Sequence, residues 1–389
     1  MKARQLQIKP TRQSLPDNNK NSGGTLMKNL ITKKSLVIAA ALSFAFMMTS
    51  CNKKTAADKS NALYTLTFAR GASGHALNPL FELGKRYYSE YGVDVKVVPL
   101  EREQIFESES IGKVDGAYND LAFPLQFGGN GGNIVIYGGA MNGGMALLAN
   151  PKVAAENPDI KNPANWKGLS ITVQPFSIGE LISKSTLRNT YNLIPDVDVK
   201  YKIIQGQPEE LAAVQKGNAD IVIIGPDFVE TGKNMGLTYL FPLVALEDNY
   251  VCCRQTANAD KFNAEKDAFQ RLLKAHIRAY KDYKTGDKQA LVKEMSKTSG
   301  VEEDWIYDYL YDLDKTQGRT HNPDPNYNGS LAVYETLEID RPLQEYFNID
   351  VYAKALTEII EEFPSDNFYK EMWDFFITHN NKYPNFNYS

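Results

Sequence analysis

The feature that most constrains the fold of this chain is a repeated alternation of strand-like and helix-like segments. The clearest strand patterns cover residues 63–69, 93–100, 169–173 and 219–224. The last of these is almost wholly aliphatic, which is typical of a strand that is buried on both faces. Helical patterns separate the strands, so the sequence predicts an α/β fold built from strand–helix–strand units.

Two of the expected helices carry start signals that a helix needs for physical reasons. Asn78 followed by Pro79 suits an N-cap and the first helical position. Pro208 precedes two glutamates, which favour the positive end of a helix dipole, and Gly217 suits the position after the last turn. These signals predict helices that begin at about residues 79 and 208.

The strand–helix pattern stops at Asn150-Pro151 and then restarts, which predicts two similar α/β lobes. Two crossings of the chain, near Ala149 and Tyr250, would form a hinge between them. From Asp260 onward the sequence is nearly all helical. We therefore expect lobe 1 to comprise residues 62–149 together with the helical part 249–389, and lobe 2 to comprise residues 150–248.

The first cysteine, Cys51, follows a short apolar run at residues 36–48. Such a run is too short for a spanning helix, which needs about 20 residues. Lysines precede the run and small residues follow it, so residues 27–50 are predicted to be an export signal peptide. The cysteine resembles the lipid-bearing cysteine of a bacterial lipobox; the alternative is a signal peptide with an incidental cysteine. Lipid on Cys51 would hold the chain at a membrane, with the polar residues 51–61 as a tether.

Residues 1–26 are polar and rich in asparagine and lysine, unlike the start of a signal peptide. We predict that translation starts at Met27 and that residues 1–26 are not part of the native protein. Mapping the initiation site checks this prediction. A native precursor whose intact mass includes Gln7 or Lys20 would contradict it.

Composition excludes several classes of function. The net charge is −4 with no basic block beyond the N-terminal region, so nucleic acid is not an expected partner. The chain has three cysteines and no CxxC, HExxH or His/Cys cluster, so neither a disulfide framework nor a zinc site is expected. It has no P-loop and no GxSxG motif. Cys252 and Cys253 lie on a predicted strand, where we expect two small buried side chains that face opposite ways.

Three segments together resemble the periplasmic solute-binding proteins of ATP-driven importers. They are GKVDGAYNDLAFPLQFGGNGGNIVIYGGAMNGGMALLANP (112–151), NPANWKGLSITVQPFSIGELI (162–182) and GQPEELAAVQKGNADIVIIGPDF (206–228). The nearest group is the one for sulfonates, taurine, nitrate and the pyrimidine precursor of thiamine, and the likeness covers about residues 63–283. The loop 70–75 and Phe176-Ser177 depart from the family patterns. The resemblance therefore does not identify the ligand of this protein.

The resemblance implies a two-lobed periplasmic-binding-protein type II fold with a two-crossing hinge and a helical C-terminal extension. It implies a monomer without a cofactor or catalytic residues, in the cell envelope and facing the periplasm or the exterior. Its partners would be a small solute, a membrane permease and a separate ATPase. The alternatives are an enzyme on the same fold, such as one of thiamine-pyrimidine or other cofactor biosynthesis, and a surface sensory or scavenging receptor. An export signal disfavours a cytoplasmic enzyme.

Ligands of open α/β sheets bind outside the carboxyl ends of the strands, so the loops after the strands are the candidate site. Helix capping is the competing role for Asn119, Asp120, Ser177 and Asp227. The expected ligand-binding residues are Gly71, Ser73, His75, Tyr118, Asn119, Asp120, Asn142, Phe176, Ser177, Gln205, Asp227 and Tyr250.

The chemistry of these residues predicts two features of the ligand. The carboxylate of Asp120 favours an amine or another hydrogen-bond donor. The glycines near Gly71 and the helix start at Ser177 favour an anionic group, because free N–H groups point toward the cleft there. A zwitterion or a polar aromatic heterocycle would satisfy both. Glu101 is expected to be a solvated loop charge.

Overall fold

The computed structural model describes residues 64–71, 77–248 and 250–388. The predicted signal peptide, Cys51 and the tether lie outside the described residues. Within the described part of the chain, no helix is long and apolar enough to cross a membrane.

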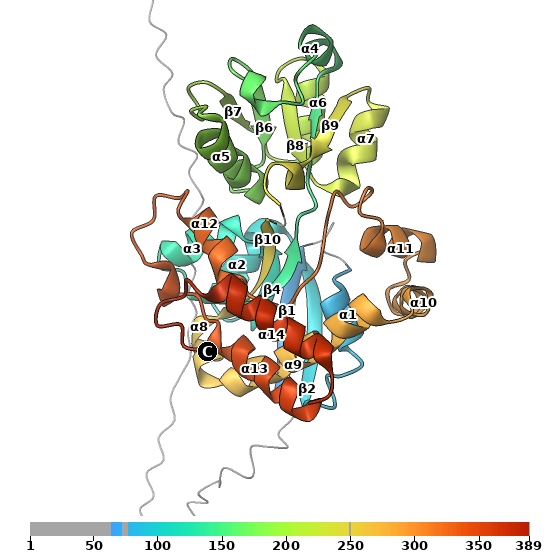
Figure 1. Ribbon diagram of the computed structural model, residues 1–389, viewed down its shortest axis with the longest axis vertical. Coiled ribbons are helices and arrows are strands. Elements are labelled where there is room, and N and C mark those ends of the chain that lie inside the picture. The colour runs from blue at the N-terminus through green and yellow to red at the C-terminus, as the bar shows by residue number, and fades with distance from the viewer. Residues whose placement is uncertain (1–63, 72–76, 249, 389) are drawn as a thin grey trace, which may run out of the picture. The chain divides into compact units, whose positions relative to one another are not determined.

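The first sheet has five strands in the order β2-β1-β3-β10-β4 (Figure 1). Strand β1 pairs in parallel with β2 and β3, whereas β10 is antiparallel to both β3 and β4. The strand β10 therefore returns from a distant part of the sequence to the centre of the sheet. The bounds are β1 Tyr64–Gly71, β2 Val93–Leu100, β3 Gly116–Asp120, β4 Ile134–Asn142 and β10 Val251–Asn258.

The second sheet also has five strands, in the order β7-β6-β8-β5-β9. Strand β6 pairs in parallel with β7 and β8, whereas β5 is antiparallel to β8 and β9. Every residue of β8 is buried, as its aliphatic sequence predicts. The bounds are β5 Ala146–Ala149, β6 Ser170–Val173, β7 Lys200–Ile203, β8 Ile221–Ile224 and β9 Thr238–Pro242.

The chain passes between the two sheets twice, once from β4 to β5 and once from β9 to β10. The predicted α/β class, with two lobes and a two-crossing hinge, is confirmed. We call the first sheet with its helices lobe 1 and the second sheet with its helices lobe 2. Because β5 pairs within the second sheet, the first crossing lies at residues 143–145, ahead of Ala149 where the sequence placed it.

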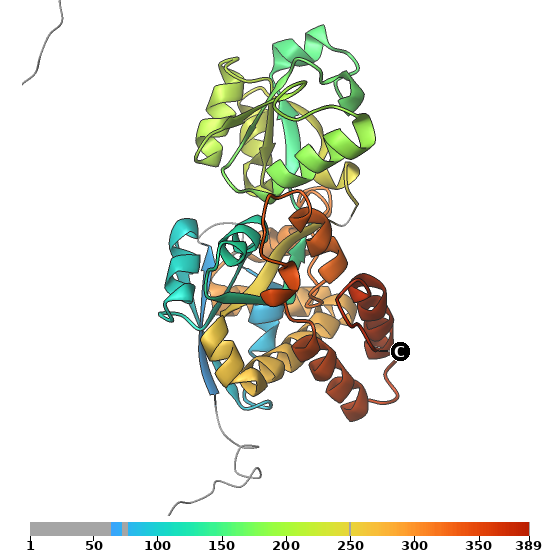
Figure 2. The same cartoon turned by 90° about the vertical axis from the view of Figure 1, so that its left-hand side faces the viewer.

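Helices pack around both sheets, and the predicted helical C-terminal region is present (Figures 1 and 2). Helix α9 packs on α1 and on α13. The predicted cap of α1 is confirmed, because Asn78 Oδ1 accepts a hydrogen bond of 2.9 Å from the Leu80 N–H. The bounds are α1 Pro79–Gly84, α2 Arg102–Ser110, α3 Ala122–Gly129, α4 Pro151–Glu156, α5 Ile178–Tyr191, α6 Gln207–Gln215, α7 Val229–Asn234, α8 Ala259–Ala264, α9 Lys266–Thr285, α10 Lys288–Ser299, α11 Glu303–Tyr311, α12 Tyr327–Tyr334, α13 Asp350–Glu362 and α14 Asn367–Asn380.

The segment between α11 and α12, residues 312–326, contacts both lobes, and we call it the crossover loop. Its Thr320 exchanges two backbone hydrogen bonds of 2.9 Å with Asn142 in lobe 1. On the other side, the Tyr239 hydroxyl of lobe 2 donates to Gln317 Oε1 at 2.7 Å. A side chain at Gly143 would come within 2.5 Å of the Gly318 carbonyl oxygen, so the backbones approach closely here. The loop thus adds a third stretch of chain beside the hinge.

A buried glutamate on α2 makes the stability of lobe 1 dependent on pH. Glu109 is fully buried, and its Oε2 accepts a hydrogen bond of 2.9 Å from the Thr256 hydroxyl. Its Oε1 has no partner among the described residues. Burial raises the pKa of this carboxyl from 4.5 to about 8. The folded state therefore keeps a proton that the unfolded chain loses, and stability falls as the pH rises from about 4.5 to about 8.

We expect Glu109→Gln to remove this dependence. We compare the melting temperature of the variant with that of the wild type at each pH. The difference, variant minus wild type, should be larger at pH 8.5 than at pH 5 by at least about 2 °C. Thermal unfolding followed by circular dichroism at the two pH values measures it. Glu107→Gln, an exposed position on the same helix, is the matched control. An equal pH profile for Glu109→Gln and the wild type would contradict the assignment.

Candidate ligand-binding site

A cavity of about 520 Å³ is lined by residues of both lobes, and we call it the cleft. Its volume is in the range that holds a small organic ligand. Its walls come largely from the loops that follow strands, as the rule for open α/β sheets requires. Six of the predicted residues line it: Gly71, Asn119, Asp120, Ser177, Gln205 and Asp227.

The other predicted residues that the structure describes do not line the cleft. Tyr118 is buried in lobe 1 and stacks on Phe81 with ring centroids 4.4 Å apart. Phe176 has a left-handed backbone (φ 54°) and a side chain that is 49 % exposed, outside the lining of the cleft. Ser73 and His75 lie outside the described residues. Ligand contact at these positions stays a prediction.

Asp120 joins the two lobes through its carboxylate. Its Oδ1 accepts a hydrogen bond of 2.9 Å from the Ala122 N–H at the start of α3. Its Oδ2 accepts one of 3.0 Å from the Ile178 N–H at the start of α5 in lobe 2. Helix N-termini attract anions, so both contacts are favourable. The helix start that the sequence assigned to the ligand's anionic group therefore holds a carboxylate of the protein. Ser177 completes this helix start, because its hydroxyl accepts from the Glu180 N–H at 3.2 Å.

Arg319 of the crossover loop is the functional candidate that sequence reasoning missed. Its side chain lines the cleft, although the residue is only 3 % exposed. Among the described residues, its Nε and Nη1 have no hydrogen-bond partner. The guanidinium carbon lies 4.4 Å from the centroid of the Tyr309 ring. Burial lowers the pKa of Arg319, but Tyr309, the Asp227 carboxylate, Cys252 and Cys253 together raise it by more, so the group stays charged. No local pattern marks a single arginine in a polar loop.

Arg254 on β10 shows what a structural buried arginine looks like in the same region. Its Nε donates to the Pro325 carbonyl oxygen at 2.8 Å, and its Nη1 donates to the Cys253 carbonyl oxygen at 2.7 Å. Nη1 and Nη2 also donate to Asn142 Oδ1 at 3.1 and 3.2 Å. Asn142, which the sequence proposed as a ligand contact, is thus engaged by the hinge. Arg254 ties β4, β10 and the crossover loop together.

The other charged side chains in the cleft are acidic. Glu101 lines the cleft and is exposed there, although the sequence favoured a solvated loop charge without a role in the pocket. Together with Asp120 and Asp227 it places carboxylates in the same cavity as Arg319. A cavity with both signs of charge suits a ligand that carries both signs.

The two adjacent cysteines face each other, contrary to the prediction from strand alternation. The Sγ atoms of Cys252 and Cys253 lie 3.4 Å apart, as free thiols. Irregular pairing of β10 with β4 between Val251 and Cys253 explains this, since a bulge breaks the alternation of side chains. Both residues are buried, as expected, and Cys252 lines the cleft.

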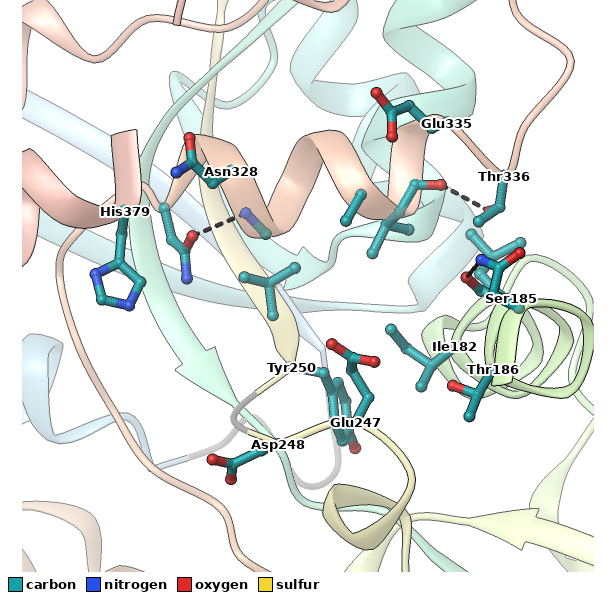
Figure 3. Close-up of a pocket in the computed structure, with 17 residues that line it drawn as sticks. Ile182, Ser185, Thr186, Glu247, Asp248, Tyr250, Asn328, Glu335, Thr336 and His379 are labelled. Atoms are coloured by element: carbon teal, nitrogen blue, oxygen red, sulfur yellow. Dashed lines mark hydrogen bonds between the residues drawn. The ribbon is translucent and has the colours of Figure 1, made fainter. Parts of the chain in front are cut away.

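A second cavity of about 590 Å³ lies beside Tyr250, the last predicted residue (Figure 3). Its walls come from α5, α12 and the turn before β10, with Glu247, Glu335 and His379 among the polar groups. These walls include no loop at the carboxyl end of a parallel strand. We therefore place the candidate site in the cleft. Within the described part of the chain, no three His, Cys, Asp or Glu side chains are placed to hold a metal ion.

Comparisons with known proteins agree on the fold. The aliphatic sulphonate binding protein SsuA from Escherichia coli matches 73 % of this chain and 92 % of its own, with 18 % identity and a TM-score of 0.56. The nitrate-binding protein NrtA from Synechocystis PCC 6803 matches 77 % and 90 %, with 15 % identity and a TM-score of 0.58. The desulfurization enzyme DSZB matches 76 % and 99 %, with 15 % identity and a TM-score of 0.50.

These matches show that the chain has the periplasmic-binding-protein fold, which the sequence predicted from its motifs. No family model matches the sequence, and no curated protein matches it. The solved structures that share this fold include binding proteins and an enzyme, so the fold does not by itself decide the function.

The two buried arginines should respond in opposite ways when the charge is removed. We expect Arg319→Met to stabilise the ligand-free protein by about 1–3 kcal/mol, because it removes a buried cation whose Nε and Nη1 have no hydrogen-bond partner among the described residues. We expect Arg254→Met to destabilise it by about 2–4 kcal/mol, because it leaves buried carbonyl groups without donors. Urea unfolding of the ligand-free variants measures both. A destabilised Arg319→Met protein would show that Arg319 is structural.

Proposed function

We propose that this chain is the substrate-binding lipoprotein of an ABC-type importer, and that it captures a small polar or zwitterionic organic solute in the cleft. The observation that carries the proposal is the buried guanidinium of Arg319, which lines a cavity between two lobes and whose Nε and Nη1 have no hydrogen-bond partner among the described residues. Burying a cation without a partner is unfavourable. An anionic ligand would supply the missing partner.

The cleft also suggests how the ligand is oriented. Its anionic group, such as a sulfonate or a carboxylate, would accept hydrogen bonds from Arg319, whose fork of donors suits a planar or tetrahedral oxyanion. An amine or another donor would face Asp227 or Glu101. Asp120 is already held by two helix N-termini and would join the lobes rather than bind the ligand directly.

The mechanism would be closure of the two lobes around the solute. The chain crosses between the sheets twice, and the crossover loop follows beside these crossings. The closed form would then dock on a membrane permease, and a separate subunit would hydrolyse ATP. Lipid on Cys51 would keep the protein, as a monomer, at the cell envelope on its periplasmic or outer side.

The second candidate is an enzyme on this fold, as the likeness to DSZB allows. A thiol, Cys252, lines the cleft and is the one observation that favours it. Burial raises the pKa of the neighbouring Cys253 thiol well above its usual range, which works against a reactive thiolate at Cys253. A surface sensory or scavenging receptor would use the same cleft. Turnover of a bound probe would indicate the enzyme, and a neighbouring sensor-kinase gene would indicate the receptor.

A thermal-shift screen of the folded protein tests the proposal, because a ligand that binds only the folded state raises the melting temperature. The screen includes taurine, alkanesulfonates, nitrate, thiamine pyrimidine precursors and riboflavin. We expect an anionic or zwitterionic compound to stabilise the wild type, and we expect Arg319→Gln to weaken its binding by about 1–3 kcal/mol.

Arg188→Gln removes an exposed arginine of α5 outside the cleft and is the matched control for charge. Alanine at Asp120 or Ser177 should also weaken the hit by about 1–3 kcal/mol, since each shapes the start of α5. Equal affinity in the wild type and Arg319→Gln would exclude the proposed anion contact. Unchanged affinity in both alanine variants would remove the start of α5 from the site.

A further inference from the structure

A smaller cavity of about 250 Å³ adjoins the cleft, and we call it the side chamber. It is walled by α11 and the crossover loop on one side and by the start of α7 on the other. It shares three lining residues with the cleft: Pro226, Asp227 and Arg319. Arg319 is therefore part of the walls of both cavities.

The side chamber contains an aromatic side chain that the fold leaves partly uncovered. Trp305 on α11 is 44 % exposed, and its ring stacks on Tyr309 at 4.9 Å between centroids with an interplanar angle of 17°. Tyr309, in contrast, is buried and lies against Arg319. A tryptophan held by stacking on one ring presents a rigid apolar surface, which is what an aromatic or aliphatic ligand group needs.

Two cations, Lys315 and Arg319, line the side chamber together with the carboxylates of Asp227, Glu230 and Asp308. Lys315 already pairs with Asp308 at 2.5 Å and with Asp312 at 3.9 Å. Among the described residues, Arg319 has no such ion pair. A ligand that enters from the cleft would thus meet a cation first and an apolar wall beyond it.

We propose that the ligand is an organic anion with an apolar tail, whose anionic head binds Arg319 and whose aryl or alkyl tail lies in the side chamber against Trp305. This inference rests on the proposed binding function and specifies its substrate class. A cavity of about 150 Å³ is enough to hold benzene, so the side chamber can hold one ring or a short chain. Inorganic nitrate and other short anions would leave it unfilled.

Isothermal titration calorimetry with a probe series tests the proposal. The probes are methanesulfonate, butanesulfonate, hexanesulfonate and 2-phenylethanesulfonate, which share one head group. For the wild type we expect affinity to rise about fourfold for each methylene that enters the chamber. In Trp305→Ala the affinity for hexanesulfonate and 2-phenylethanesulfonate should fall about tenfold, with methanesulfonate unchanged.

Leu313→Ala is the matched control, because Leu313 is an exposed apolar side chain of the crossover loop that lines neither cavity. Its affinities should follow those of the wild type. Arg319→Gln should weaken binding of every probe, whatever the tail.

Tryptophan emission gives a second readout that does not depend on the alanine variant being folded. The chain has three tryptophans, of which Trp166 is fully buried. Binding of 2-phenylethanesulfonate should change the emission of the wild type. Trp305→Phe should bind 2-phenylethanesulfonate with an affinity within about threefold of the wild type, because the stack on Tyr309 is retained. Most of the change in tryptophan emission on binding should be lost in this variant.

The possible failures separate the two proposals. Affinity that depends on Arg319 but not on tail length or Trp305 would contradict the proposal that the ligand's tail binds in the side chamber. It would leave the proposed function unaffected. An equal loss for methanesulfonate and the long probes in Trp305→Ala would also overturn it. Failure of every probe to bind the wild-type protein would overturn the substrate class. The thermal-shift screen described above would then be the remaining test of the proposed function.

Discussion

The hydrogen bonds of the Arg254 guanidinium are the constraint on which the candidate site depends. They connect the ends of β4 and β10 to the crossover loop at Pro325. Because each donor meets a carbonyl or amide oxygen, a cation can be buried here without a carboxylate in direct contact. Desolvation still lowers its pKa to about 10, a value at which the group remains charged at neutral pH. The loop is thereby fixed beside the hinge.

Fixing that loop has a direct consequence for the cleft. Arg319 lies six residues before Pro325, and the backbone pairing of Thr320 with Asn142 sets its position. Arg254 on β10 and Arg319 in the crossover loop are buried to a similar degree but differ in their partners. Arg254 is satisfied by the protein, and Arg319 is not satisfied by the described residues. A fold that keeps such a charge gives up stability, which is characteristic of a binding site.

The contacts of Asp120 change what the ligand is expected to be. The sequence predicted that the Asp120 carboxylate binds an amine of the ligand. In the structure this carboxylate instead bridges the starts of α3 and α5. In the proposed binding mode, the anionic group of the ligand contacts Arg319 in the C-terminal part of the chain rather than the N-terminus of α5. Arg319, which lines the cleft, and Trp305, which lines the side chamber, both come from the helical region after residue 300, where the family resemblance has faded.

The sequence by itself determined the local structure and the class of fold. The aliphatic run marked β8, start signals marked α1 and α6, and the restart after Asn150 marked a second lobe, because each depends on neighbours a few residues away. Only the tertiary structure decided that the thiols of Cys252 and Cys253 touch, since one bulge reverses a side chain. It also decided that Arg319 lines a cleft built from residues about 70 to 250 positions earlier. Contacts at such distances follow from packing and strand order, which no local pattern encodes.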